Sequence, residues 1–142
     1  MSLAEPGRAG RLQRAAALLY TALSLVVIGF QIALAAGAPW GEYAMGGAYP
    51  GRVPPPIRVT AVLQGGLAAL LASVVLARAG VAVRRWARSS RRWIWAVVAL
   101  ALVSTVLNLI TPSAGERARW APVAVALLLT SLIVARGPAA ER

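Results

Sequence analysis

Four long apolar runs, with every charged residue outside them, limit what this chain can fold into. They cover residues 15–38, 59–77, 93–111 and 120–135. The first run would form a helix of roughly 36 Å, enough to cross a hydrocarbon core of about 30 Å. The last run would reach only about 24 Å, so its flanking arginines would extend to the interface or the bilayer would thin. We predict an all-α protein: a four-transmembrane-helix bundle of two helical hairpins with structured outer loops, forming one integral membrane domain over residues 1–142.

The composition agrees with a membrane protein. Hydrophobic residues make up 59% of the chain and charged residues 13%, with a mean hydropathy of +0.70. Soluble domains carry about 25% charged residues. A net charge of +11 would indicate nucleic acid binding in a soluble chain. Here the apolar runs dominate, so we expect no nucleic acid partner and instead a bilayer with anionic headgroups.

The first apolar run could also be a cleaved signal peptide, because residues 33–38 (ALAAGA) have small side chains at suitable spacing. Two features argue against cleavage. The run is longer than the roughly 7 to 15 residues of a signal peptide core, and Pro39 directly follows the candidate site. We therefore expect the segment to be retained as a helix.

The arginines are distributed unevenly among the polar segments. Eleven of the fifteen lie before the first run, between the second and third, or after the fourth, and four lie in the other two links. Positively charged residues concentrate on the cytoplasmic side of membrane proteins. We predict a multi-pass membrane protein with both termini cytoplasmic, so that the two links rich in glycine and proline face outward.

The residue types that are missing exclude several chemistries. The chain has no histidine, cysteine or aspartate. It therefore lacks the residues for a Ser-His-Asp or Cys-His nucleophile system, a disulfide or the usual zinc ligand set. We predict no metal site and no cofactor. Any proton chemistry would fall to glutamate, tyrosine, arginine or water.

Three amide side chains interrupt the apolar runs: Gln31, Gln64 and Asn108. Each lies in the half of its run nearer to an outward link. An amide without a partner is unfavourable in hydrocarbon, so these side chains should turn inward and meet one another, backbone groups or water. They would either hold the helices together or form the floor of a hydrated pocket.

The first outward link places Glu42 between Trp40 and Tyr43. A carboxylate flanked by aromatic rings can bind an organic cation through charge and cation–π attraction. If desolvated, it can exchange protons. The alternative is an ion pair with Arg52 or Arg58 that holds the loop in place.

The second outward link leads into the fourth apolar run. Glu116 is well placed near a helix N-terminus, and we expect Pro122 in the first turn, where its missing N–H is harmless. Each half of the chain then has one amide near the membrane boundary and one carboxylate beyond it. This is an approximate resemblance between the halves and does not establish a repeat.

The motifs GAPWGEYAMGG, PPPIR and NLITPSAGERARWAPV resemble those of an uncharacterised family of small bacterial four-span integral membrane proteins. The resemblance covers nearly the whole chain and implies the same fold and a place in the bacterial plasma membrane, without implying an activity. Met45 stands where the family has an aromatic residue before the paired glycines. The positions that the resemblance marks are Trp40, Glu42, Tyr43, Gly46, Gly47, Arg58, Asn108, Ser113, Glu116 and Arg117.

Three functions remain open at this point. The first is binding or transport of a lipid-like or organic-cation ligand at an outer-face pocket, with transport requiring a homo-oligomer. The second is a membrane-embedded enzyme of isomerase or cyclase type, with Glu42 and Glu116 as acid and base. The third is an accessory subunit of a larger membrane complex. The candidate ligand-binding residues are Gln31, Trp40, Glu42, Tyr43, Arg58, Gln64, Asn108, Ser113, Glu116, Arg117 and Trp120.

Overall fold

A computed structural model describes residues 7–138, which contain four long helices and no strand. The long helices are α1 (Arg8–Ala35), α2 (Pro55–Arg78), α3 (Ala87–Ile110) and α4 (Ala114–Arg136). Three short 3₁₀ helices occupy the links: η1 (Gly41–Tyr43), η2 (Met45–Gly47) and η3 (Arg84–Trp86). Each long helix is long and apolar enough to cross a membrane. The domain predicted over residues 1–142 also includes 1–6 and 139–142, which lie outside the described residues.

The helices extend beyond the apolar runs that predicted them. α1 begins at Arg8 because residues 8–14 consist mainly of good helix formers, and Gln13 packs there at only 3% exposure. α4 begins at Ala114 because the Ser113 hydroxyl oxygen accepts a hydrogen bond of 3.1 Å from the Glu116 backbone N–H and caps the helix. The prediction that Pro122 lies in the first turn is therefore wrong. Pro122 lies inside α4.

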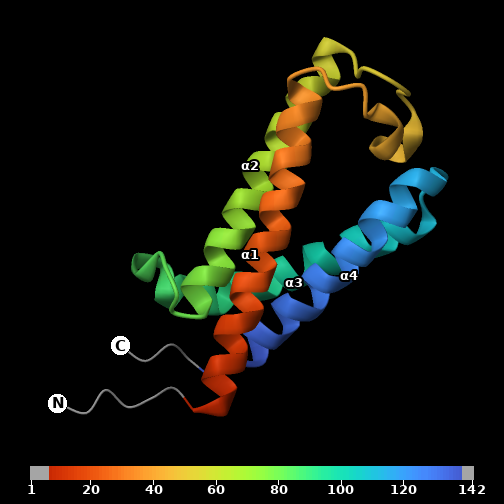
Figure 1. Ribbon diagram of the computed structural model, residues 1–142. Coiled ribbons are helices and arrows are strands. Elements are labelled where there is room, and N and C mark those ends of the chain that lie inside the picture. Colours follow the sequence, from red (N-terminus) through yellow and green to blue (C-terminus); the bar gives the residue numbers. More distant parts are fainter. Residues whose placement is uncertain (1–6, 139–142) are drawn as a thin grey trace.

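The helices form two antiparallel hairpins that cross at one end and diverge toward the other (Figure 1). α1 pairs with α2 and α3 pairs with α4, while α1 also packs on α4 and α2 on α3. Residues 79–86 join the hairpins at the end where the N-terminus of α1 and the C-terminus of α4 lie, which we call the termini end. The links 36–54 and 111–113 lie at the opposite end, the loop end.

The main hydrophobic core lies at the termini end, where all four helices meet. Its fully buried members include Ala17 of α1, Val75 of α2, Val97 of α3 and Val134 of α4. A smaller cluster around Leu34 packs the first link onto α1 and α2 at the loop end. Between these two clusters the hairpins separate, so the fold leaves a space on the loop side of the crossing.

Hydrogen bonds to the C-terminus of α4 reinforce the crossing. The Arg78 guanidinium donates to the carbonyl oxygens of Ala135, Gly137 and Pro138 at 3.2, 2.7 and 2.7 Å. The Gln13 amide donates to the Val134 carbonyl oxygen at 3.0 Å. The last carbonyls of a helix lack partners within the helix, so these donors satisfy groups that are otherwise unpaired.

Most of the apolar surface of the helices points away from the protein. In the most apolar 18-residue segment of each helix, only 22% to 33% of the residues are buried inside the protein. Leu63 and Ile110 are 68% and 69% exposed. Apolar surface of this extent is unfavourable in water and favourable against hydrocarbon. The four helices therefore have the surface expected of membrane-spanning segments.

Candidate functional site

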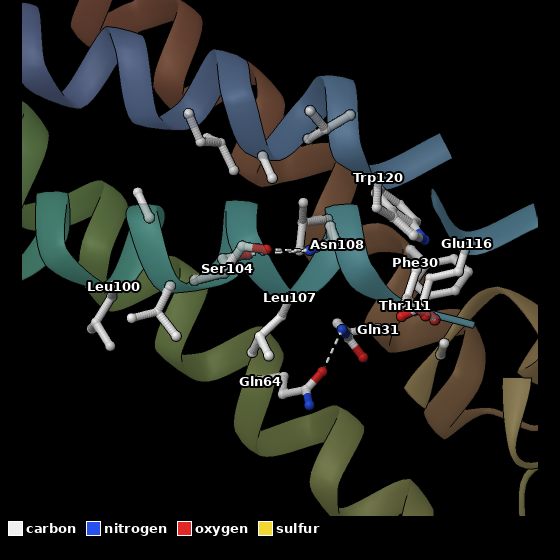
Figure 2. A pocket seen from close by; sticks show the side chains of 18 of the residues that line it. Phe30, Gln31, Gln64, Leu100, Ser104, Leu107, Asn108, Thr111, Glu116 and Trp120 are labelled. Carbon is white, nitrogen blue, oxygen red and sulfur yellow. Dashed lines mark hydrogen bonds between the residues drawn. The ribbon is translucent and has the colours of Figure 1, made fainter. Parts of the chain in front are cut away.

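A cleft of about 780 Å³ lies between the diverging hairpins (Figure 2). All four long helices contribute to its walls, and residues 43–46 of the first link line it at the loop end. We call residues 41–47 the roof. Toward the termini end the walls are mainly aliphatic. The aliphatic wall includes Leu67 and Leu71 of α2, Leu100 of α3 and Leu127 of α4, and Leu107 of α3 lies nearer the loop end.

Two of the three predicted amides meet in the cleft. Gln31, which is 9% exposed, donates its amide to the side-chain oxygen of Gln64 at 2.8 Å. The two helices approach closely at Gly65, where a β-carbon would lie 3.4 Å from the Gln31 β-carbon. The Gln31 side-chain oxygen is buried without a hydrogen-bond partner. This oxygen is enclosed by the protein, so its lack of a donor is locally unfavourable to the fold.

Asn108 also lines the cleft but does not join the glutamine pair (Figure 2). Its amide donates to the Ser104 carbonyl oxygen at 2.8 Å and lies 3.4 Å from the Ser104 hydroxyl oxygen. We expected each amide to meet another amide, a backbone group or water, and Gln31 and Gln64 bond to each other while Asn108 bonds to a backbone carbonyl of its own helix. Such local bonds compete well with contacts across a bundle.

The roof belongs to the link between α1 and α2, but its hydrogen bonds are to the first turns of α4 and the residue before it. The Gly46 backbone N–H donates to the Glu116 carboxylate at 2.8 Å, across 70 residues of sequence. The Ser113 hydroxyl donates to the Glu42 carbonyl oxygen at 2.8 Å. The Glu116 carboxylate also accepts a hydrogen bond of 2.7 Å from the Thr111 hydroxyl. Glu116 therefore connects the roof to the α3–α4 hairpin.

Two glycines are needed for this docking. Gly46 has a φ of +70°, a left-handed conformation that turns its N–H toward Glu116. Gly115 lies under the Tyr43 ring, where a β-carbon would lie 2.9 Å from a ring carbon. The sequence marked Gly46 through the family resemblance, but it contained no signal for Gly115.

Aromatic rings gather where the roof meets the helices. Phe30 stacks on Trp40 with ring centroids 6.2 Å apart and contacts Trp120 at 4.7 Å with tilted rings. The Arg119 guanidinium lies 4.0 Å from the centre of the Tyr43 ring. Phe30 was not among the predicted site residues. Its position directly before Gln31, at the loop end of the first apolar run, is the signal that could have identified it.

The structure brings six of the predicted site residues to the cleft: Gln31, Tyr43, Gln64, Asn108, Glu116 and Trp120. The other five lie outside its lining. Trp40 is 44% exposed and covers Phe30 from outside. Glu42 is exposed, and Ser113 caps α4. Arg58 and Arg117 donate to the carbonyl oxygens of Val53 and Thr111 at 3.2 and 2.9 Å.

The two glutamates therefore occupy different environments. Glu116 lines the cleft and is held by neutral donors, whereas the Glu42 side chain points to the exterior. Within residues 7–138, Glu42 forms no ion pair with Arg52 or Arg58, which was the alternative account of the first link. A catalytic pair made of these two carboxylates would have only one member at the cleft.

Comparisons with protein-family models, with curated proteins and with solved structures give no match. The resemblance to the bacterial family thus stays a hypothesis. The fold and the site themselves define the class: residues 7–138 form an all-helical protein with four helices of membrane-spanning length around a cleft.

Proposed function

We propose that this multi-pass membrane protein binds a lipid-like amphiphile in the cleft between its hairpins. The observation that carries the proposal is the polarity of the cleft along its length. Its deep part is lined mainly by aliphatic side chains, with Tyr20 and Ser24 beside them, whereas its loop end presents the Gln64 amide and the Glu116 carboxylate. A volume of about 780 Å³ lies within the range of about 300 to 1,000 Å³ usual for small-molecule sites.

The proposed ligand lies with its tail toward the termini end. There the side chains of Leu71, Leu100 and Leu127 offer apolar contacts. Its polar group lies at the loop end, where the Gln64 amide and the Glu116 carboxylate line the cleft. A carboxylate accepts hydrogen bonds, so the site favours a molecule with a donor at one end.

The ligand enters from the side of the cleft. The roof covers the loop end, and the main core closes the termini end. Leu67, Leu100 and Leu107 line the cleft and yet are 46%, 44% and 57% exposed, so the cleft is open between the hairpins. In a bilayer that opening faces hydrocarbon. We propose the loop end as the outward face of a bacterial plasma membrane, and a homo-oligomer if the protein also transports its ligand.

Substituting one alanine tests the proposal. Ala68 lines the cleft, whereas its neighbour Ala69 is exposed and lies outside the lining. Ala68→Trp fills the cleft, and Ala69→Trp places the same ring on the bilayer side. Each protein is purified in a neutral detergent and labelled with a lipid that carries a photoactivatable group on its acyl chain. Labelled residues are then mapped by mass spectrometry.

We expect labelling at cleft residues in the parent protein and in Ala69→Trp, and loss of that labelling in Ala68→Trp. Circular dichroism and a thermal scan of both variants show whether the helices are retained. Equal labelling of all three proteins at the cleft, with the fold intact, would contradict the proposal.

A further inference from the structure

The cleft carries a negative charge, whereas the chain as a whole is positively charged. The chain has fifteen arginines and four glutamates, but no arginine within residues 7–138 lines the cleft. Among the described residues, Glu116 is the one charged side chain in its lining. In a protein with a net charge of +11, the cleft is therefore a local site of negative charge.

The Glu116 carboxylate has no arginine partner in the described part of the chain. One of its oxygens accepts hydrogen bonds from the Gly46 N–H and the Thr111 hydroxyl. The other accepts none from residues 7–138. The nearest arginines in sequence are engaged elsewhere: Arg117 donates to the Thr111 carbonyl oxygen, and Arg119 lies over the Tyr43 ring.

Aromatic rings border the same end of the cleft. Phe30 and Trp120 both line it, and Figure 2 shows them beside Glu116 and Thr111. The faces of aromatic rings attract cations. Arg119 already occupies the Tyr43 ring, whereas no cation from the described residues lies over the ring of Phe30 or Trp120. A cation placed beside Glu116 would therefore meet a carboxylate oxygen and two rings that hold no other cation.

These features select the charge of a ligand. A carboxylate next to an apolar cleft is unfavourable without a counter-charge, because low-dielectric surroundings strengthen electrostatic interactions. A cationic group offsets that charge, a neutral group leaves it unpaired, and an anionic group is repelled.

We propose that the ligand is an amphiphile with a cationic amine head and an apolar tail, whose ammonium group binds the free oxygen of Glu116. This inference rests on the proposed function and names the ligand class at that site. Glu116 selects the head, and the leucine wall binds the tail. A molecule with the same tail and a neutral head would enter the cleft but bind more weakly.

Three photoactivatable probes with one tail test the charge preference. They are hexadecylamine, hexadecanol and hexadecanoate, each with a diazirine on the tail, added to the protein in a neutral maltoside detergent. We expect labelling at the cleft in the order amine, alcohol, carboxylate. The amine should label at about tenfold lower concentration than the alcohol, as expected for a charge-assisted hydrogen bond. Equal labelling by amine and alcohol would overturn the inference, with no substitution required.

Glu116→Gln removes the charge while the amide oxygen can still accept from Gly46 and Thr111. The matched control is Glu42→Gln, which removes the same charge from an exposed position at the same end of the molecule. We expect amine and alcohol to label Glu116→Gln equally, and Glu42→Gln to retain the preference for the amine. Persistence of the preference in Glu116→Gln would refute the role of this carboxylate.

Ala68→Trp distinguishes the two proposals. If Ala68→Trp blocks both amine and alcohol but the parent protein does not favour the amine, the cleft binds amphiphiles and only the charge preference is wrong. If Ala68→Trp blocks neither probe, the cleft is not the binding site, and both proposals fail.

Discussion

The indole N–H of Trp120 donates a hydrogen bond of 2.9 Å to the backbone carbonyl oxygen of Tyr43, 77 residues earlier. This bond crosses from one hairpin to the other at the loop end. Together with the bond from Gly46 to Glu116, it attaches the roof to α4 although the roof is a continuation of α1. The shape of the cleft therefore depends on both hairpins.

Gly115→Ala should loosen the roof. Its new methyl group would lie 2.9 Å from a carbon of the Tyr43 ring, so the ring and the attached backbone must move. We expect a loss of about 1 to 3 kcal/mol of stability, as for other overpacked sites. Unfolding in mixed micelles, followed by circular dichroism, measures the loss.

Gly66→Ala is the matched control, because a β-carbon at Gly66 meets nothing within 4 Å. It should leave stability unchanged or raise it by up to about 1 kcal/mol through helix propensity. An equal loss in both variants would show that the contact between Tyr43 and Gly115 does not stabilise the docked roof.

The pair of amides in the cleft should be coupled. Gln31→Leu and Gln64→Leu each leave one amide without its partner, whereas the double substitution removes both. Interhelical hydrogen bonds in membranes average about 0.6 kcal/mol, so we expect a coupling free energy of that order from the double-mutant cycle. A coupling of zero would mean that the 2.8 Å contact does not stabilise the fold.

Arg78 should be among the residues most important for stability. It is 7% exposed and donates to three carbonyl oxygens at the end of α4. Arg78→Met removes these donors and should lower the free energy of unfolding by at least about 2 kcal/mol. Arg78→Lys should be more stable than Arg78→Met, because the ammonium group can still donate to some of these carbonyl oxygens. It should be less stable than the parent protein, because an ammonium group has fewer donors than the planar guanidinium.

Arg88→Met is the control. It removes an arginine from an exposed position of α3 and keeps the hydrogen bonds from Arg78 to the end of α4, which we call the α4 cap. Stability equal to that of Arg78→Met would contradict the importance of the cap. Thermal scans of the purified variants in one detergent provide the comparison.

The chain contains no cysteine, so single introduced thiols report the sidedness of each link without background. Glu42→Cys lies in the roof and Ser89→Cys lies near the start of α3, and both positions are exposed. The arginine distribution predicts that a membrane-impermeant maleimide labels Glu42→Cys, but not Ser89→Cys, in intact cells. Labelling of Ser89→Cys alone would reverse the proposed orientation.

Several local features of the site could be predicted from sequence. The third apolar run was expected to stop at residue 111, directly before Pro112, and α3 ends at Ile110. Glu116 was expected near a helix N-terminus, and it lies in the first turn of α4. These predictions succeeded because capping and the effect of proline depend on a few neighbouring residues. Pro122 was misplaced because a serine cap nine residues earlier began the helix before the apolar run.

The sequence by itself determined that the described chain is helical and has four helices of membrane-spanning length, because uncharged runs of this length can satisfy their backbone groups only as helices in hydrocarbon. Only the tertiary structure decided that the hairpins diverge, that the roof crosses to α4, and that Glu116 lines the cleft while Glu42 does not. The divergence of the hairpins depends on the angle at which the helices cross, which small side chains in the core set. The docking of the roof depends on single contacts between residues about seventy positions apart in the sequence. Hydropathy along the chain encodes neither of them.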